Sequence, residues 1–159
     1  AGTQYSGLKH SKPDMFKGAN MVLVPKHGED MMKLQALRDL LVIAGFSSVS
    51  ITTASKHDEI IAFTSQLAHI VSNAYVKSPS AKSHKGISAG SYKDLTRGAY
   101  LNENMWTELF MDNRDNLLRE INGFIENLSK YSEALENEDS EKLRELLIEG
   151  KTAKEMAES

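Results

Sequence analysis

The stretch 104–136, NMWTELFMDNRDNLLREINGFIENLSKYSEALE, carries the most regular apolar pattern in the chain. Two sets of apolar side chains recur in it every seven residues, offset by four: Phe110, Leu117, Phe124 and Tyr131, and Ile121, Leu128 and Leu135. A seven-residue apolar repeat is typical of a coiled-coil-like stripe along a helix. One helix over 104–136 would be roughly 45 Å long at about 1.5 Å per residue, which exceeds a small domain. We therefore expect this helix to pack against a partner, in a homodimer.

The residues before this helix carry a second helical pattern. In 55–78, SKHDEIIAFTSQLAHIVSNAYVKS, the apolar residues share one face at helical spacing: Ile60, Phe63, Leu67, Val71 and Ala74. Ser55 and Asp58 have the spacing of a capping box at the helix start. The Ser-, Gly- and Lys-rich stretch 78–94 predicts a loop, and 139–159 predicts a short amphipathic helix with a polar tail.

The first third of the chain alternates strand-like and helix-like segments. ANMVLVP (19–25) and FSSVSITTA (46–54) are β-rich runs. Between them the apolar residues repeat at helical spacing before a Gly45 C-cap: Leu34, Leu37, Leu41 and Ala44. Strand, helix and strand within about thirty residues form an α/β unit. We expect it to be the end of an α/β domain, residues 1–54, joined near Ser55 to a mostly helical domain, residues 55–159.

The composition excludes several classes of function. The chain has 159 residues and a net charge of −3, which gives no general affinity for nucleic acid or an acidic membrane. Its longest apolar run, LLVIAGF, is too short to cross a bilayer. The absence of cysteine excludes disulfides and cysteine-based catalysis. Nothing in the sequence argues for export, so a cytoplasmic location is the default expectation.

His69 is the first candidate for a binding role. It lies opposite the apolar face of its helix, on the same side as Ser65, Gln66 and Asn73. A polar stripe on a helix with few charges is typical of the lining of a wet cavity. The alternative is a surface or core histidine with a local hydrogen bond.

A second candidate site lies in SAGSYKDLTRGAY, residues 88–100. Gly90 allows a backbone to come close to a ligand. Arg97 stands three residues after Asp94, one turn if the segment is helical, and could clamp a carboxylate while Asp94 holds it in place. The alternative is a surface ion pair. Trp106, the only tryptophan, is by itself typical of a core or an interface.

Other motifs are missing from the sequence. Neither the Walker spacing nor GxGxxG occurs. Four further histidines lack the i, i+4 pairing of a zinc site, and we predict no metal: His10, His27, His57 and His84. From the residues alone we predict an anionic-ligand pocket in a helical dimer, and no reaction.

Several stretches, in order along almost the whole chain, resemble the prephenate dehydrogenase family. AGTQYSG at 1–7 is similar to the end of the family's His-Pro-Met-Ala-Gly-Thr-Glu-x-Ser-Gly motif, with Gln4 in place of Glu. KHDEIIAFTSQLAH at 56–69 resembles the family's Glu-His-Asp helix that runs to Ser-His-Leu-Pro-His. SYKDLTRGAYLNENMWTELFMDN at 91–113 is similar to its Phe-x-Asp-x-Thr-Arg-Ile-Ala stretch and Trp-bearing helix.

The resemblance implies a mostly α fold: the C-terminal helical dimerisation domain of a 6-phosphogluconate-dehydrogenase-like dehydrogenase, preceded by the terminal β-α-β piece of a Rossmann-type α/β domain. It also implies that the chain is the C-terminal part of such an enzyme. The rest of the nucleotide-binding domain, which would bind NAD or NADP, and the family's base histidine would precede Ala1. The chain would then retain no catalytic residue, and we expect it to be inactive alone.

The reaction implied by the resemblance is the NAD(P)-dependent oxidative decarboxylation of prephenate to 4-hydroxyphenylpyruvate, in tyrosine biosynthesis. A hydride leaves the ring carbon that bears the hydroxyl, and the ring carboxylate leaves as carbon dioxide. Arg97 matches the family's carboxylate-binding arginine, and His69 matches a histidine that contacts the substrate. Thr3, Gly90 and Trp106 match positions that line the same pocket.

Asp94 matches the family's acid beside that arginine, near the dimer interface. Three positions depart from the family's pattern. Gln66 replaces the first histidine of the histidine motif but still donates and accepts hydrogen bonds, so we expect it to support the site together with Ser65. Ala68 replaces the motif's proline and lets the helix continue. Gly98 replaces an isoleucine and is expected to loosen the turn that orients Arg97.

Alternatives to a prephenate dehydrogenase remain open at this point. One is an arogenate dehydrogenase. Another is a non-catalytic helical dimerisation or regulatory module that binds a small aromatic amino acid. Feedback binding of L-tyrosine and the choice between NAD and NADP also stay open.

Overall fold

The computed structural model describes residues 7–26, 28, 30–83, 86–87 and 90–158. Thr3 and Gln4, together with His27 and His84, lie outside the described residues. The chain forms two compact units, Ala1–Ile60 and Ile61–Ser159. No helix in the described part of the chain is long and apolar enough to cross a membrane.

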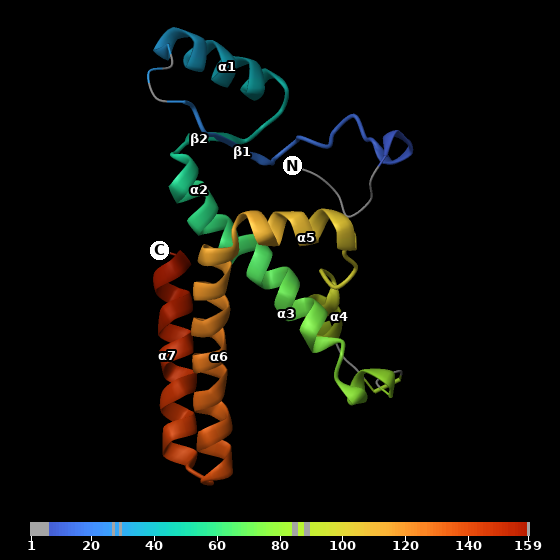
Figure 1. Cartoon of the computed structure of the whole chain (residues 1–159), viewed down its shortest axis with the longest axis vertical. Helices are drawn as coiled ribbons and strands as arrows, with labels where there is room; N and C mark the ends of the chain where they lie inside the picture. The colour runs from blue at the N-terminus through green and yellow to red at the C-terminus, as the bar shows by residue number, and fades with distance from the viewer. Residues whose placement is uncertain (1–6, 27, 29, 84–85, 88–89, 159) are drawn as a thin grey trace. The chain divides into compact units, whose positions relative to one another are not determined.

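The first unit contains the predicted strand, helix and strand. β1 (Asn20–Leu23) and β2 (Ser48–Ile51) pair in parallel, with Asn20 opposite Ser48 and Leu23 opposite Ile51. Parallel neighbours need a crossover, which α1 (Met31–Ile43) provides (Figure 1). Gly45 follows α1 with φ of 102°, a left-handed conformation that glycine adopts without steric cost. The predicted β-α-β piece is therefore confirmed, with a short η1 (Leu8–His10) before it.

The predicted helix over 55–78 is a continuous helical run that contains one wide turn. α2 (Ala54–Ile61) continues into the π-helical segment η2 (Ala62–Leu67) and then into α3 (Ala68–Tyr75). The helix begins one residue earlier than expected, because the Thr53 hydroxyl accepts the Lys56 backbone N–H at 3.2 Å. The capping box at Ser55 is therefore wrong. Asp58 instead meets the Nδ1 atom of His57 at 2.9 Å.

The stretch 78–94, predicted as a loop, contains two short helices. η3 (Pro79–Lys82) follows α3, and α4 (Gly90–Thr96) packs against α3. Tyr92 of α4 lies near Tyr75, with ring centroids 6.1 Å apart. Ser and Gly suggested irregular backbone here, but α4 gains tertiary contacts that a sequence pattern does not show.

The long helix predicted over 104–136 is two helices. α5 (Glu103–Asp112) ends at Asn113, and α6 (Arg114–Glu136) starts there in a steeply different direction (Figure 1). Asn113 has φ of −110° and ψ of 27°, outside the helical range. Its side-chain amide donates to Gln66 Oε1 at 2.9 Å, a contact between residues far apart in the sequence. Phe110, the first residue of the seven-residue repeat, lies on α5 and packs on Trp106, with ring centroids 5.3 Å apart.

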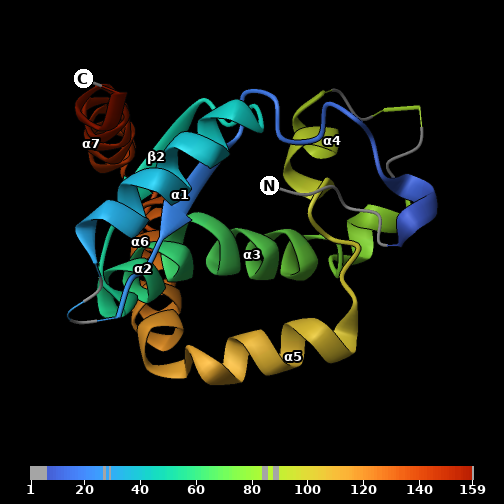
Figure 2. The ribbon, with the colours of Figure 1, turned by 90° about the horizontal axis from the view of Figure 1, so that it is seen from above.

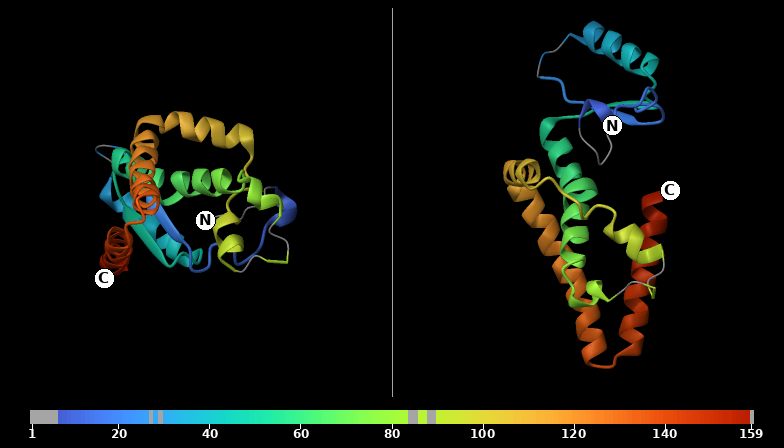
Figure 3. Two further views of the ribbon diagram at one scale, coloured as in Figure 1. Left: turned by 90° about the horizontal axis from the view of Figure 1, so that it is seen from below. Right: turned by 90° about the vertical axis from the view of Figure 1, so that its right-hand side faces the viewer.

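A helical hairpin forms the C-terminal part of the second unit. α6 and α7 (Ser140–Glu158) pack near their connecting turn and diverge away from it (Figure 3). The packed end buries Ala134 and Leu146, and the Tyr131 hydroxyl donates to the Leu146 carbonyl at 3.2 Å. α7 continues to Glu158, so the predicted polar tail is helical. Ion pairs one turn apart, such as Lys151 with Glu155 at 3.7 Å, support this last part of the helix.

The core of the second unit lies where η2 packs against α6. Its buried apolar residues are Ala62, Leu67 and Leu117. Seen from above, α5 runs alongside η2 and α3 (Figure 2).

Candidate functional site

His69 on α3 joins two segments that are distant in the sequence. Its Nδ1 atom lies 3.0 Å from the carbonyl oxygen of Gly98, which follows α4. Its ring lies against the indole of Trp106 on α5, with centroids 4.3 Å apart and planes inclined by 54°. The side chain is only partly buried. The structure therefore brings together two of the predicted site residues, His69 and Trp106.

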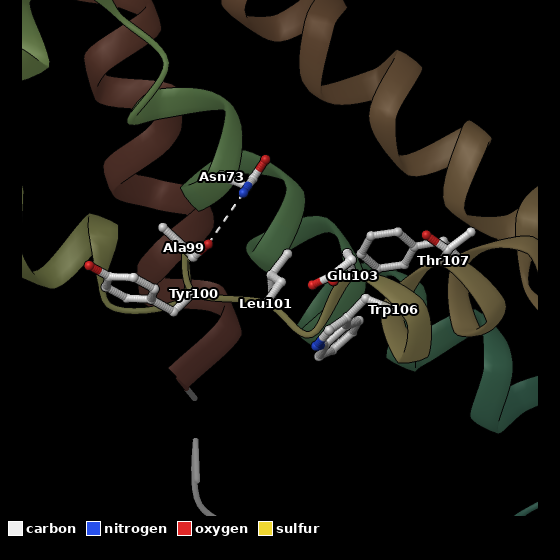
Figure 4. Close-up of a pocket in the computed structure, with 8 residues that line it drawn as sticks. Asn73, Ala99, Tyr100, Leu101, Glu103, Trp106 and Thr107 are labelled. Carbon is white, nitrogen blue, oxygen red and sulfur yellow. Dashed lines mark hydrogen bonds between the residues drawn. The ribbon is translucent and has the colours of Figure 1, made fainter. Parts of the chain in front are cut away.

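Asn73 lies one helical turn after His69 and, like His69, contacts a backbone carbonyl of the segment that follows α4. Its side-chain amide donates to the carbonyl of Ala99 at 3.2 Å (Figure 4). Two successive carbonyls, those of Gly98 and Ala99, are thus held by side chains from successive turns of α3. This pair of contacts fixes the segment after α4 against α3.

Arg97 and Asp94 are both exposed. Within the described residues, neither the predicted surface ion pair nor a hydrogen bond joins the two side chains. Arg97 immediately precedes the carbonyl that contacts His69, so its backbone lies beside the His69–Trp106 pair. Gly90 is the first residue of α4, and a Cβ placed there would lie 4.0 Å from the carboxylate of Asp94.

Gln66 is 4% exposed and uses both ends of its amide inside the protein. Its Nε2 donates to the carbonyl of Leu109 at 3.0 Å, and its Oε1 accepts from Asn113 at 2.9 Å. Asn113 in turn accepts from Asn116 at 2.8 Å. This network ties η2 to the corner between α5 and α6. Ser65, the other predicted supporting residue, is partly buried in η2.

A pocket of about 330 Å³ opens on one side of Trp106 (Figure 4). Its lining comes from α3, the 99–101 segment and one face of α5: Asn73, Ala99, Tyr100, Leu101, Glu103, Trp106, Thr107 and Phe110. Among the described residues, Trp106 and Asn73 are the lining residues that the sequence pointed to, Asn73 as part of the polar stripe on its helix. The others were missed, although positions 103, 106, 107 and 110 follow the spacing of one helical face.

These groups fit the binding of a small organic ligand. The aromatic rings of Trp106 and Phe110 give an apolar wall, and Asn73 and Glu103 give polar contacts at its edge. In the part of the chain that the structure describes, no group of three or more His, Cys, Asp or Glu side chains could hold a metal ion.

The helix α6 presents an exposed apolar face. Four of its residues, spaced by three to seven positions, are 47–63% exposed: Leu118, Ile125, Leu128 and Leu135. The seven-residue repeat does not follow burial, since Leu117 is buried within the unit while Phe124 of the same set is exposed, as are Leu128 and Leu135. We call the four exposed residues the α6 apolar face.

Comparison with known proteins gives one family and several relatives. Residues 53–149 match the model of the family "Prephenate dehydrogenase, dimerization domain". A prephenate dehydrogenase from Bacillus subtilis is 28% identical over 90% of this chain and 40% of its own length. A cyclohexadienyl dehydrogenase from Zymomonas mobilis is 26% identical over 97% of this chain and 54% of its own length.

A solved structure shares the fold along almost the whole chain. It is the prephenate dehydrogenase from Aquifex aeolicus, in complex with hydroxyphenyl propionate and NAD+. The TM-score is 0.80 at 27% identity, over 98% of this chain and 56% of that one. The chain thus spans about half the length of the relatives it matches.

Proposed function

Because the chain belongs to the prephenate dehydrogenase family, with that family's dimerization domain over residues 53–149, we propose that it supplies the substrate pocket and dimer interface of an NAD(P)-dependent dehydrogenase that converts prephenate to 4-hydroxyphenylpyruvate. The observation that carries this proposal is the contact of His69 with both Gly98 and Trp106. It draws together two stretches, 56–69 and 91–113, whose motifs were matched separately in the sequence.

The proposed substrate contacts come from residues around this meeting point. Arg97 binds the ring carboxylate, because a guanidinium makes two parallel hydrogen bonds to a carboxylate. Its side chain is exposed and has no ion-pair partner among the described residues, which leaves it available for a ligand. In this proposal His69, Trp106 and Gly90 contribute further contacts to the substrate. Asp94 lies one turn before Arg97, at the dimer interface in this proposal.

The nicotinamide cofactor supplies a hydride acceptor in this reaction when it is bound. Since no dinucleotide-loop motif occurs in the 159 residues, we assign cofactor binding to a nucleotide-binding domain outside them. This chain binds and orients the substrate, and we assign the proton acceptor to none of its residues. The chain alone is therefore expected to bind the ligand without reducing NAD.

We also propose that the chain forms a homodimer through the α6 apolar face. The face exposes four large apolar side chains on one side of a helix of 23 residues. Such a surface is typical of an interface, since burial of apolar area contributes about 25 cal/mol per Å². The family's description as a dimerization domain supports the same assignment.

Arogenate is a second candidate substrate, favoured by one observation. Among the residues that the structure describes, Glu103 is the only charged one that lines the pocket beside Trp106. A carboxylate attracts an ammonium and repels a carboxylate. Arogenate carries an amino group where prephenate carries a keto group, so this pocket favours arogenate at the side-chain end of the substrate.

Binding of hydroxyphenyl propionate to the 159-residue chain tests the proposed pocket. Trp106 is the only tryptophan, so its fluorescence reports directly on the site. We expect a saturable change on titration, and a matched loss of that response in His69→Ala. A chain that folds and shows no saturable response at millimolar ligand would contradict the proposed pocket.

A further inference from the structure

The hydrogen bond between His69 and Gly98 determines where the imidazole carries its proton. The Nδ1 atom lies 3.0 Å from the Gly98 carbonyl oxygen. A carbonyl oxygen only accepts hydrogen bonds, so the hydrogen between the two atoms belongs to Nδ1. A neutral imidazole has a single N–H, and Nε2 is then a bare acceptor.

The Nε2 atom is open to a ligand. No residue in the described part of the chain makes a hydrogen bond to it. Among the described side chains, the only buried polar atom that lacks a partner is the hydroxyl oxygen of Ser72, so Nε2 is not sealed inside the protein. Trp106 covers one side of the ring, which holds its plane in place.

Gly98 is needed here for space. Its φ does not fall in the left-handed region, in contrast to Gly45 at 102°. A Cβ at position 98 would instead lie 3.0 Å from Nδ1 and 3.4 Å from Cε1 of His69, and 3.5 Å from the Ser72 hydroxyl. The ring would have to shift by a few tenths of an ångström to accept a Cβ at this position. The glycine therefore acts by close approach to His69, which differs from the loose turn expected from the sequence.

We propose that Gly98 is a positioning residue that holds His69 in the Nδ1–H tautomer, and so makes Nε2 a hydrogen-bond acceptor for the ligand. The ligand group that faces Nε2 is then a donor, such as a hydroxyl or an ammonium. The statement about the ligand rests on the proposed function, whereas the tautomer is a property of the chain itself.

Nitrogen-15 NMR of histidine-labelled chain tests the tautomer, at a pH where the ring is neutral. The His69 signals are assigned by their loss in His69→Gln. We expect a protonated Nδ1 and an unprotonated Nε2 in the wild type. Gly98→Ala shifts the equilibrium toward Nε2–H, because its Cβ pushes the ring off the carbonyl. Gly123→Ala is the matched control, since a Cβ there meets nothing within 4 Å.

A wild-type His69 that carries its proton mainly on Nε2 would overturn the tautomer proposal, even if Gly98→Ala does not fold. The second part of the proposal, that Nε2 accepts a hydrogen bond from the ligand, is tested in the enzyme that joins this chain to a nucleotide-binding domain. There Gly98→Ala should raise KM about 10-fold while kcat changes little, as expected for one lost hydrogen bond. An unchanged KM in Gly98→Ala, together with a shifted His69 tautomer, would reject the hydrogen bond between Nε2 and the ligand. Absence of turnover in the wild type would reject the proposed function and leave the tautomer result intact.

Discussion

The side-chain amides of Gln66 and Asn113 meet at 2.9 Å and connect η2 to the corner between α5 and α6. Because Trp106 lies on α5, this contact also supports the position of its ring against His69. Gln66 is therefore a structural residue at a position where the sequence suggested a supporting part of the pocket. Its amide nitrogen donates to Leu109 and its amide oxygen accepts from Asn113.

Replacing Gln66 with leucine should destabilise the second unit. The change leaves the Leu109 carbonyl and the Asn113 amide without their partner in two part-buried hydrogen bonds, at a cost of about 0.5–1.5 kcal/mol for each. Urea unfolding followed by Trp106 fluorescence measures the effect. Asn127→Leu is the control, because Asn127 is exposed on α6. Equal stability of the two variants would show that the network does not hold the corner.

Trp106→Leu should weaken binding of hydroxyphenyl propionate by the chain. The substitution removes the ring that contacts His69 and lines the pocket. An aromatic pair contributes about 0.5–1.5 kcal/mol beyond its buried area, so we expect a loss of about 2- to 12-fold in affinity. Calorimetric titration measures it, with Tyr75→Leu as an aromatic control outside the pocket. Unchanged affinity in Trp106→Leu would place the ligand elsewhere.

Arg97→Ala, in the enzyme with its nucleotide-binding domain, should raise KM for the substrate and leave NAD binding nearly unchanged. A hydrogen bond to a charged group contributes about 1.5–3 kcal/mol, which predicts a loss of kcat/KM of roughly 10- to 150-fold. Arg114→Ala is the control, since Arg114 pairs with Asp115 on the surface at 2.8 Å. An equal loss of substrate and NAD binding would contradict the assigned role.

Glu103→Gln should reduce the preference for arogenate over prephenate. Glu103 is exposed, so screening limits the effect to about twofold to fivefold in the ratio of kcat/KM values. Glu108→Gln, at an exposed position of the same helix outside the pocket lining, should leave the ratio unchanged. A ratio unaffected by Glu103→Gln would remove the argument for arogenate.

Leu128→Lys should convert the homodimer to a monomer. The substitution places a charge on the α6 apolar face, where Leu128 is 59% exposed in the single chain. Asn127→Lys adds the same side chain at an exposed position on another side of the helix, and should leave the dimer intact. Sedimentation equilibrium distinguishes the two states, and a stable wild-type monomer would contradict the interface.

Much of the fold was predictable because it depends on local patterns. The alternation of apolar runs around Gly45 predicted the β-α-β piece, and helical spacing predicted most of the run from α2 to α3. The bend at Asn113 could not be predicted in the same way. The seven-residue repeat continues across the bend and gives no sign of it. At the bend, the side chain of Asn113 contacts Gln66, which lies 47 residues earlier in the sequence.

The candidate site was predictable only in part. Motif resemblance pointed to His69 and Trp106, which the structure places in contact. The Asn73–Ala99 bond and the closeness of Gly98 to His69 depend on how α4 packs on α3, and spacing along the sequence carries no sign of that packing.

Reduction of NAD, followed by absorbance, tests the central proposal most directly. The protein measured is the enzyme that carries this chain with a nucleotide-binding domain, given prephenate and arogenate separately. The account predicts turnover with at least one of the two substrates, and a severe loss in Arg97→Ala. A folded protein that binds NAD and turns over neither substrate would contradict it.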